Sequence, residues 1–377
     1  MKLFRAEEVD QIPWPDSVDG RYARMFFDPL LRHGSSHFFS NVDAEIFLLV
    51  FGEKVLPVTP GRMDPGSCYV SSPYDHYIRY ARVELETIGN RWVEIPCSFV
   101  LWLLGLFLRW ARINNVIYVN NWFLSTNLYP ALNREELEEV TAFLQQQFPG
   151  RVVMFRSLNE GTDARLLEVF DSLGYSRVLS RQLYVSDLSD SSYRKKRDYK
   201  NDRKLLDSTV YEVVDGKNLS EEEIGRVIDL YNALYLEKYT ELNPHFTVQW
   251  IRTAIEQDLL HVKLLVRHGR IDGVLGFFER GGVMTTPLLG YDTSVPIDLG
   301  LYRLLSILLL VEAQERGLIL NQSSGAAGFK RGRGAVGYLE YSMVHVGAAG
   351  FRERCAWWTL GSLMRAIAEP LLRRYEL

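Results

Sequence analysis

Small polar side chains follow a short apolar run late in the chain, where Asn321, Ser323 and Ser324 come directly after residues 318–320. Amide and hydroxyl groups that leave a buried strand abruptly can face a ligand, since they offer both donors and acceptors. The same residue types also form plain Asn-Ser turns. Composition leaves both interpretations open.

Three cations come next, on a short helix predicted over residues 325–331 and just beyond it. Lys330, Arg331 and Arg333 could bind a carboxylate or a phosphate, and the guanidinium group suits bidentate recognition. Exposed cations on a short helix are the ordinary alternative.

The last predicted strand, residues 338–346, carries a carboxylate and a histidine. Alternation along a strand places Glu340 with Ser342 on one face, and Tyr341 with His345 on the other. Either face could line a site. A lone histidine in a strand is more often a core or surface residue than a base.

A tyrosine and an aspartate end the predicted strand over residues 283–291. Tyr291 and Asp292 could serve a reaction centre, and a strand-ending Tyr before a turn Asp is the competing interpretation. A helix with a leucine-rich face follows from Leu301 and ends at Gly317.

Residues 193–204 hold the one dense basic cluster in the sequence, which includes Arg194, Lys195, Lys196 and Arg197. Such a cluster could contact a phosphate backbone. A solvated linker helix is the favoured alternative, because acidic residues interleave the cations.

These candidates must be positioned by two compact units, because 377 residues exceed the usual domain length about two and a half times. Strands and helices alternate in both halves. We place the junction in the polar stretch 187–192 and predict units at 1–190 and 191–377. The class is α/β (α+β).

Local patterns predict several elements. A hairpin covers residues 46–58, Asn133 caps a helix, and Thr162 caps the next one. Residues 175–179 and 182–185 form two strands, and Pro370 kinks a C-terminal helix. The apolar run 99–108 ends at Arg109 after about half the length of a bilayer span, so we expect a buried helix and no membrane span.

Composition excludes several functions. The net charge of -4 offers no global attraction for nucleic acid, and three scattered cysteines fit a reducing compartment, with the cytoplasm as the default. His33 and His37 lack a metal-site context, so we expect no metal. Motifs of nucleotide hydrolases, dinucleotide enzymes and serine hydrolases are missing from the sequence.

The block from Leu320 to Ala335 resembles the GNAT superfamily, in its Fem-like or acetyltransferase-6-like branch. The resemblance rests on the glycine-rich turn, then Phe329-Lys330-Arg331, and a following Gly332. It covers residues 205–346, and the first half only through element order. The branch often carries two GNAT domains in tandem, which implies a degenerate first domain and a competent second one.

The resemblance implies a mixed sheet in each domain, splayed at its centre, with two strands parting after Tyr291. The acyl donor would lie in that gap and the acceptor amine would enter opposite. Donor contacts would come from the helix start at Asp298, Gly300, Tyr302 and Arg303. Gly300 stands alone where members that use coenzyme A show a loop with two small residues.

The activity implied by the resemblance is that of an N-acyltransferase, which moves an acyl group from acetyl-CoA or another acyl-CoA to a small-molecule amine without a covalent enzyme intermediate. The resemblance also lends weight to the ligand-facing interpretation of the 321–324 segment. The resemblance places Tyr291 and Asp292 near the reaction centre and supports Asn321, and the alternation of the last strand adds Glu340 to these expected catalytic residues. The expected substrate contacts are Ser323, Ser324, Lys330, Arg333 and His345.

Two alternatives remain. A Fem-like transferase would take an aminoacyl group from transfer RNA, bound through Arg194, Lys195, Lys196 and Arg197. A tandem GNAT module without catalytic activity would bind a ligand or a protein.

Overall fold

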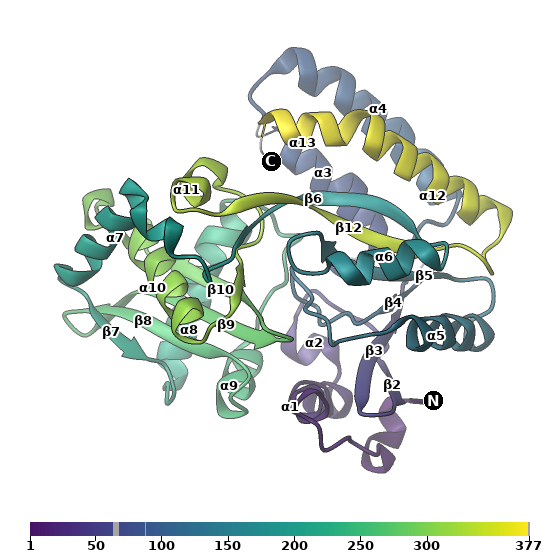
Figure 1. Ribbon diagram of the computed structural model, residues 1–377, viewed down its shortest axis with the longest axis horizontal. Helices are drawn as coiled ribbons and strands as arrows, with labels where there is room; N and C mark the ends of the chain where they lie inside the picture. Colours follow the sequence, from purple (N-terminus) through teal and green to yellow (C-terminus); the bar gives the residue numbers. More distant parts are fainter. Residues whose placement is uncertain (63–67, 87, 376–377) are drawn as a thin grey trace.

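The computed structural model describes residues 1–62, 68–86 and 88–375, and within them the strands form one twelve-stranded mixed sheet (Figure 1). The sheet order is β1-β2-β3-β4-β5-β12-β6-β11-β10-β9-β8-β7. The strands are β1 (Lys2–Phe4), β2 (Phe47–Phe51), β3 (Lys54–Pro60), β4 (Val116–Val119), β5 (Val152–Asn159), β6 (Ser176–Ser186), β7 (Glu212–Asp215), β8 (His261–Arg267), β9 (Arg270–Arg280), β10 (Val283–Tyr291), β11 (Ile319–Asn321) and β12 (Val336–His345).

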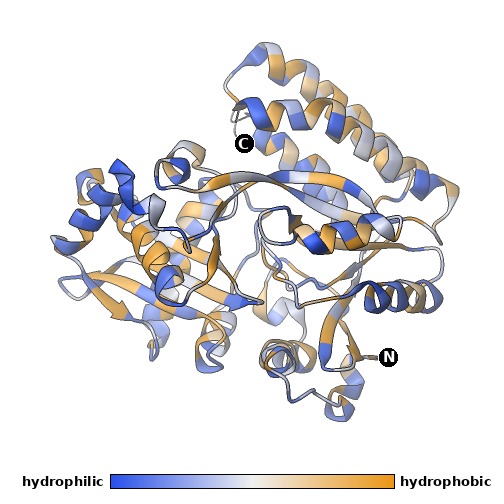
Figure 2. Cartoon of the chain, viewed as in Figure 1, coloured by the Kyte–Doolittle hydropathy of each residue, from blue (hydrophilic) through white to orange (hydrophobic). Residues whose placement is uncertain are grey.

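Helices cover the faces of this sheet, and Figure 2 shows hydrophobic residues along β9, β10 and α10 in the interior of the second half. The α-helices are α1 (Val18–His33), α2 (Ser35–Phe38), α3 (Ala81–Glu86), α4 (Arg91–Trp110), α5 (Arg134–Gln147), α6 (Ala164–Ser172), α7 (Arg197–Asp207), α8 (Glu221–Asn232), α9 (Val248–Glu256), α10 (Leu301–Glu315), α11 (Ala327–Gly332), α12 (Phe351–Leu363) and α13 (Glu369–Tyr375). Short 3-10 and π segments are η1 (Ala6–Gln11), η2 (Asp75–Tyr80), η3 (Ser191–Lys195), η4 (Ala233–Glu237), η5 (Ile297–Leu299) and η6 (Met364–Ala368). The predicted mixed α/β class is confirmed.

Each half of the sheet contains one parallel strand pair, β4 with β5 and β10 with β11, among otherwise antiparallel neighbours in the described chain. The β10–β11 pairing covers only Val283 to Thr285 against Ile319 to Asn321. Beyond Asn321 the chain leaves the sheet, while β10 continues to Tyr291. The strands therefore part, as expected, but they do so after Thr285 and not after Tyr291.

The last strand returns to the first half. β12 lies between β5 and β6 and pairs antiparallel with both, so that Met343 is opposite Phe155 on one side and Arg177 on the other. Trp357 and Leu360 of α12 share a buried cluster with Leu108 of α4. The predicted units 1–190 and 191–377 do not describe this exchange, in which residues 336–375 complete the first unit.

Several local signals are confirmed. β2 and β3 form the predicted hairpin, and Asn133 caps α5 through a capping box with Glu136. Thr162 is not the cap of α6, since Asp163 occupies that position without a side-chain cap. Residues 176–186 form a single strand, because β12 pairs with it from Ser176 to Val185. The π segment η6 directly precedes α13, whose second residue is Pro370, so the regular α-helical pattern is interrupted just before the predicted proline.

The expected buried helix is exposed. α4 begins at Arg91, eight residues before the expected start, and only 17% of its apolar window is buried. By length and composition alone, this one helix within the described residues is long and apolar enough to cross a membrane. The expected range covers only the run from Phe99, whereas the helix continues through Pro96 back to Arg91.

Candidate functional site

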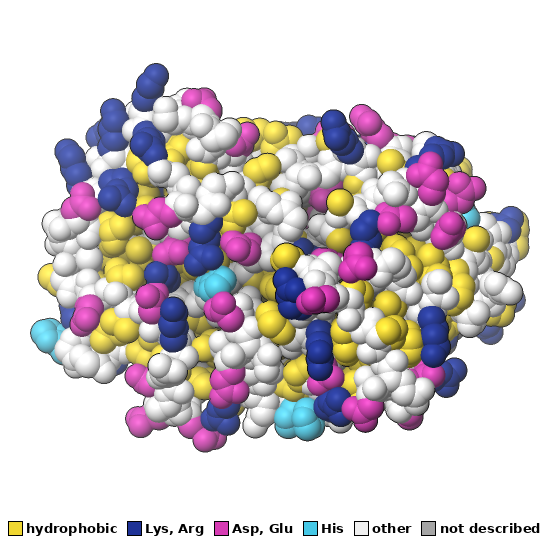
Figure 3. Space-filling view, turned by 60° about the horizontal axis from the view of Figure 1, so that its bottom comes forward, with side chains coloured by type: hydrophobic (Ala, Val, Ile, Leu, Met, Phe, Trp, Pro, Cys, Tyr) yellow, Lys and Arg dark blue, Asp and Glu magenta, His cyan; other side chains and the backbone are white. Residues whose placement is uncertain are grey.

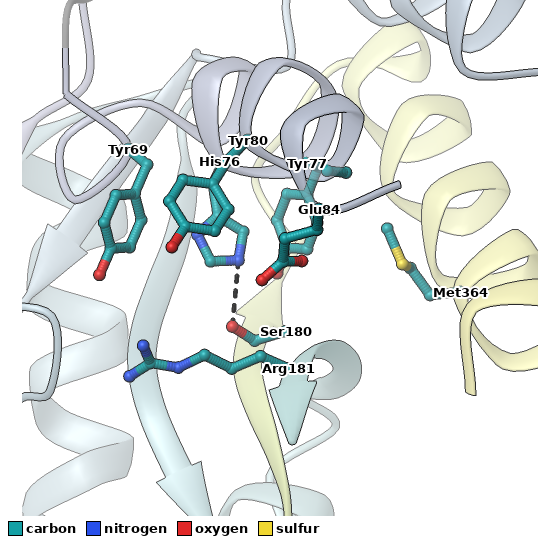
Figure 4. Close-up of a pocket in the computed structure, with 9 residues that line it drawn as sticks. Tyr69, His76, Tyr77, Tyr80, Glu84, Ser180, Arg181 and Met364 are labelled. Carbon is teal, nitrogen blue, oxygen red and sulfur yellow. Dashed lines mark hydrogen bonds between the residues drawn. The ribbon is translucent and has the colours of Figure 1, made fainter. Parts of the chain in front are cut away.

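A small polar cavity lies between the π segment η2 with α3 on one side and strand β6 on the other. Its volume is about 30 Å³. Figure 4 shows the Tyr69 and Tyr80 hydroxyls and the Glu84 carboxylate pointing toward the Ser180 and Arg181 side of the cavity. The lining residues are Tyr69, His76, Tyr77, Tyr80, Ala81, Glu84, Ser180, Arg181 and Met364.

A hydrogen-bonded chain of four side chains forms the floor of this cavity. His76 Nε2 lies 3.0 Å from Ser180 Oγ, which donates to Glu340 Oε1 at 3.1 Å. Arg181 donates from Nε and Nη2 to the two Glu340 oxygens at 3.0 and 3.1 Å. Glu340 is only 2% exposed, so this ion pair is shielded from water.

The directions of these hydrogen bonds show which ring nitrogen of His76 carries the proton. Because the Ser180 hydroxyl donates to Glu340, it accepts from His76, which places the imidazole proton on Nε2. Nδ1 is then a bare acceptor, buried and without a partner among the described residues. No carboxylate orients Nδ1, so the group is not a Ser-His-Asp triad.

Two groups in the cavity have shifted pKa values. Burial, with Arg156 and Arg181, holds the pKa of His76 well below its ordinary value, so the ring is neutral. Burial raises the pKa of Glu84 to about 7, against the opposing effect of Arg181. The Glu84 carboxyl, which titrates near neutral pH, can accept a proton there, and the neutral imidazole is the weaker base of the two.

Glu84 gives a pH-dependent prediction. An acid whose pKa rises from 4.5 to about 7 on folding binds more protons in the folded state, so its contribution to the free energy of unfolding falls as pH rises through that window. In Glu84→Gln this fall disappears. Urea unfolding from pH 4.5 to 8 measures the free energy of unfolding of both proteins. The difference between variant and wild type should change with pH up to about pH 7 and then stay constant. His76 titrates in both proteins, so most of its contribution cancels. A difference that is the same at every pH would contradict the assignment.

The parted strands lie beside the start of α10. Gly300 caps this helix with a φ of 66°, and no side chain caps its first N–H groups. In the preceding loop the N–H groups of Ser294, Val295 and Leu299 bond within the loop itself. The first turn of α10 is thus the uncapped donor set at this edge.

Aromatic rings fill the space next to this helix start. The Tyr302 ring lies 6.0 Å from that of Tyr291 and 4.7 Å from that of Phe329. Tyr235 stacks on Tyr231 at 5.0 Å, and burial raises its pKa. It packs against the buried cluster that contains Tyr231 and against the one that contains Leu289 of β10.

Asp202 of α7 bonds to two of the predicted ligand-binding residues, Arg303 and Arg333. Its fully buried carboxylate accepts from Arg303 Nε at 2.6 Å and from Arg333 Nε at 2.5 Å. These bonds tie α7 to α10 and to the end of α11. An open groove of about 460 Å³ runs beside them, lined by Asp198, Asn201, Asp202, Arg303, Gly328, Phe329 and Arg333.

Other predicted residues have structural partners. Asn321 accepts the Ser323 N–H, as in an Asn-Ser turn, and the Lys330 ammonium donates to the carbonyls of Gln322, Ser323 and Ser324 at 2.7 to 3.2 Å. Burial, with the charge of Arg181, lowers the pKa of Lys330 to about 7. Lys330 is therefore buried inside this turn, unlike the exposed cation that one interpretation predicts.

Three more predicted residues lie apart from the cavity. The Asp292 carboxylate accepts from Ser294 and Arg226, and these bonds lower its pKa to about 2. Asp298 is exposed on η5. His345 bonds to Gln145, and the five residues that separate it from Glu340 along β12 span about 17 Å.

Sequence reasoning missed His76, Glu84, Ser180 and Arg181. Ser180 and Arg181 interrupt two apolar runs, and this pattern predicts a break between two strands, although both residues lie inside β6 and line the cavity. A polar pair in an otherwise buried strand was the available signal. His76 and Glu84 stand in a tyrosine-rich stretch with no motif around them.

Comparisons with known proteins identify the fold. No family model matches the chain, and no curated protein is significantly similar to it. The crystal structure of FemX superposes with a TM-score of 0.51 over 91% of this chain and 97% of that chain, at 7% identity. A tandem GNAT protein from the clavulanic acid biosynthesis pathway aligns over 93% and 99%, at 10% identity and a TM-score of 0.40.

A third solved structure covers less of the chain. The C-terminal domain of a putative lysylphosphatidylglycerol synthetase from Agrobacterium fabrum aligns over 62% of this chain and 78% of its own, at 16% identity and a TM-score of 0.45. The FemX superposition is the one that supports an inference. It confirms the expected Fem-type fold.

Proposed function

We propose that the protein is an acyl- or aminoacyltransferase that passes an activated acyl group directly to an amine. The observation that carries this proposal is the parting of β10 and β11 beside the uncapped start of α10. A gap between strands exposes backbone groups to a donor carbonyl, and the helix start favours an anionic group of the donor.

The reaction needs no enzyme nucleophile. The amine nitrogen attacks the donor carbonyl carbon, a C–N bond forms, and the C–O bond of an ester or the C–S bond of a thioester breaks. The ammonium proton passes to a base before attack, and the leaving oxygen or sulfur takes up a proton. We assign the base to His76 Nδ1 or Glu84, with Ser180 and Glu340 holding the imidazole.

Two donors fit this scheme, and we favour aminoacyl-tRNA over the acyl-CoA expected from the sequence. The loop before α10 uses its N–H groups internally, so few are left to hold a pyrophosphate. Exposed cations on η3 and α7 flank the same helix start, where Leu205 lies 2.7 Å from the position of a Cβ built on Gly300. Figure 3 shows Lys and Arg side chains gathered at the upper left, over the end of the molecule where Figure 1 places α7.

Replacing Lys195, Lys196 and Arg197 by alanine tests the donor. Each cation lost from a phosphate contact reduces the slope of log affinity against log salt by about 1, so the triple variant should bind charged tRNA at least about tenfold more weakly. The measurement is isothermal titration with charged tRNA, acetyl-CoA and longer acyl-CoAs.

The matched control removes three exposed cations elsewhere, Arg24, Arg165 and Lys217. It should bind tRNA like the wild type. If the wild-type protein turned over an acyl-CoA and bound no tRNA, acyl-CoA would replace aminoacyl-tRNA as the favoured donor. Absence of binding to every donor would favour the module without catalytic activity.

A further inference from the structure

Helix α4 has two apolar faces, and only one of them is used inside the protein. Leu104, Gly105 and Leu108 are buried against η2, where a Cβ built on Gly105 would lie 3.1 Å from the Tyr74 hydroxyl. The opposite face is exposed, and Trp92 reaches 91%. Its members are Trp92, Ile95, Phe99, Trp102, Leu103, Leu106 and Trp110.

These seven side chains form one continuous stripe, called here the α4 stripe. At 100° per residue they fall within about 100° of the helix circumference. Three of the seven are tryptophans, a residue type that prefers the boundary between lipid and water. A contiguous exposed apolar stripe of this size, with seven large side chains on one helix face, marks an interaction surface.

The exposed charges on α4 and on the C-terminal helices have one sign, while Glu86 of α3 is an exposed acid. On α4, α12, η6 and α13, every exposed charged side chain within the described residues is an arginine. Arg91 and Arg109 stand at the two ends of α4 beside the stripe, and Arg352 of α12 lies over the Trp110 ring at 4.8 Å. The other arginines are Arg354, Arg365, Arg373 and Arg374. The complement of this pattern is a flat, negatively charged surface with an apolar interior.

A second copy of the chain fits less well. A two-fold dimer brings identical patches together, so antiparallel α4 helices would place Arg91 of each copy near Arg109 of the other. Like charges at both ends would oppose that contact, and no exposed acid on α4 offsets them.

A spanning orientation of α4 also fits less well. Crossing a bilayer would strip Leu104 and Leu108 from their buried contacts with η2 and α12. Lying flat keeps those contacts and immerses the stripe alone.

From the stripe and its arginines we infer that α4 docks on the surface of an anionic lipid bilayer, in the plane of the interface. The tryptophans and leucines enter the boundary between headgroups and acyl chains, and the arginines contact lipid phosphates.

Flotation of the full-length protein with vesicles tests this inference. We expect binding to phosphatidylcholine vesicles that contain phosphatidylserine, weaker binding to phosphatidylcholine alone, and a blue shift of tryptophan emission on binding. The variant Trp92→Ser/Phe99→Ser/Trp102→Ser should lose at least about tenfold of the affinity, because the apolar area supplies the insertion energy. All three positions are exposed, so folding is preserved.

The control Val18→Ser/Val210→Ser removes exposed apolar side chains from other faces and should bind like the wild type. Three outcomes overturn the inference. They are absence of wild-type binding to anionic vesicles, equal binding by the triple variant, and a wild-type dimer in light scattering that the triple variant dissociates, which would assign the stripe to a second copy or another protein.

Discussion

An Arg181→Met variant is expected to lose about 3–5 kcal/mol of the free energy of unfolding. The substitution leaves the Glu340 carboxylate buried with no countercharge, and it also removes the donor to the Ser125 carbonyl and to Thr126. Equilibrium unfolding in urea measures the loss. Such a cost is a large part of the stability of an ordinary domain.

Two further variants distinguish the loss of the Arg181–Glu340 ion pair from the loss of the Arg181 side chain itself. Arg181→Met/Glu340→Met replaces both charges by apolar groups and should recover most of the loss, because no buried charge is left unpaired. Arg177→Met breaks a more exposed pair with Asp171, and should cost only about 0.2–1 kcal/mol. If the double variant were as unstable as the single one, the ion pair would not explain the effect.

A proline in β12 should have the second large effect. Met343 is fully buried in a central strand, so Met343→Pro removes a ladder hydrogen bond and a core side chain together, at a cost of about 5 kcal/mol. The informative result is where in the protein the structure is loosened. Amides of β5 and β6 in the first unit should lose their protection from hydrogen exchange.

Val213→Pro is the matched control, since β7 lies at the edge of the sheet and pairs only with β8. It should cost less and leave the exchange of β5 and β6 unchanged. If Met343→Pro loosened only residues 191–335, the first unit would be independent of the returning strand.

Much of the fold could be predicted from local sequence. The hairpin over residues 46–58, the capping boxes at Asn133 and Ser220, and the leucine face of α10 each depend on neighbours within one or two turns. The tandem organisation followed from the Leu320–Ala335 resemblance and the order of elements. The exchange of β12 could not be predicted, because strand pairing across more than 150 residues leaves no mark in local periodicity.

The site was harder to predict than the fold. Glu340 was chosen from the alternation of its strand, but its meaning depends on Arg181, which is 159 residues away in sequence. Lys330 is predicted as a contact for a substrate carboxylate or phosphate, but its ammonium is buried and donates to three backbone carbonyls of its own turn. The exposure of α4 was missed because an apolar helix reads as core unless its partners are known.

The return of β12 has a consequence for how the protein is made. Synthesis on the ribosome delivers β5 and β6 long before the strand that separates them, so the nascent first half carries two unpaired strand edges until the C-terminus emerges. Such edges invite mispairing and aggregation. The first unit is therefore translated before the second but completed after it, and a premature stop codon after Ala335 would leave it unfinished.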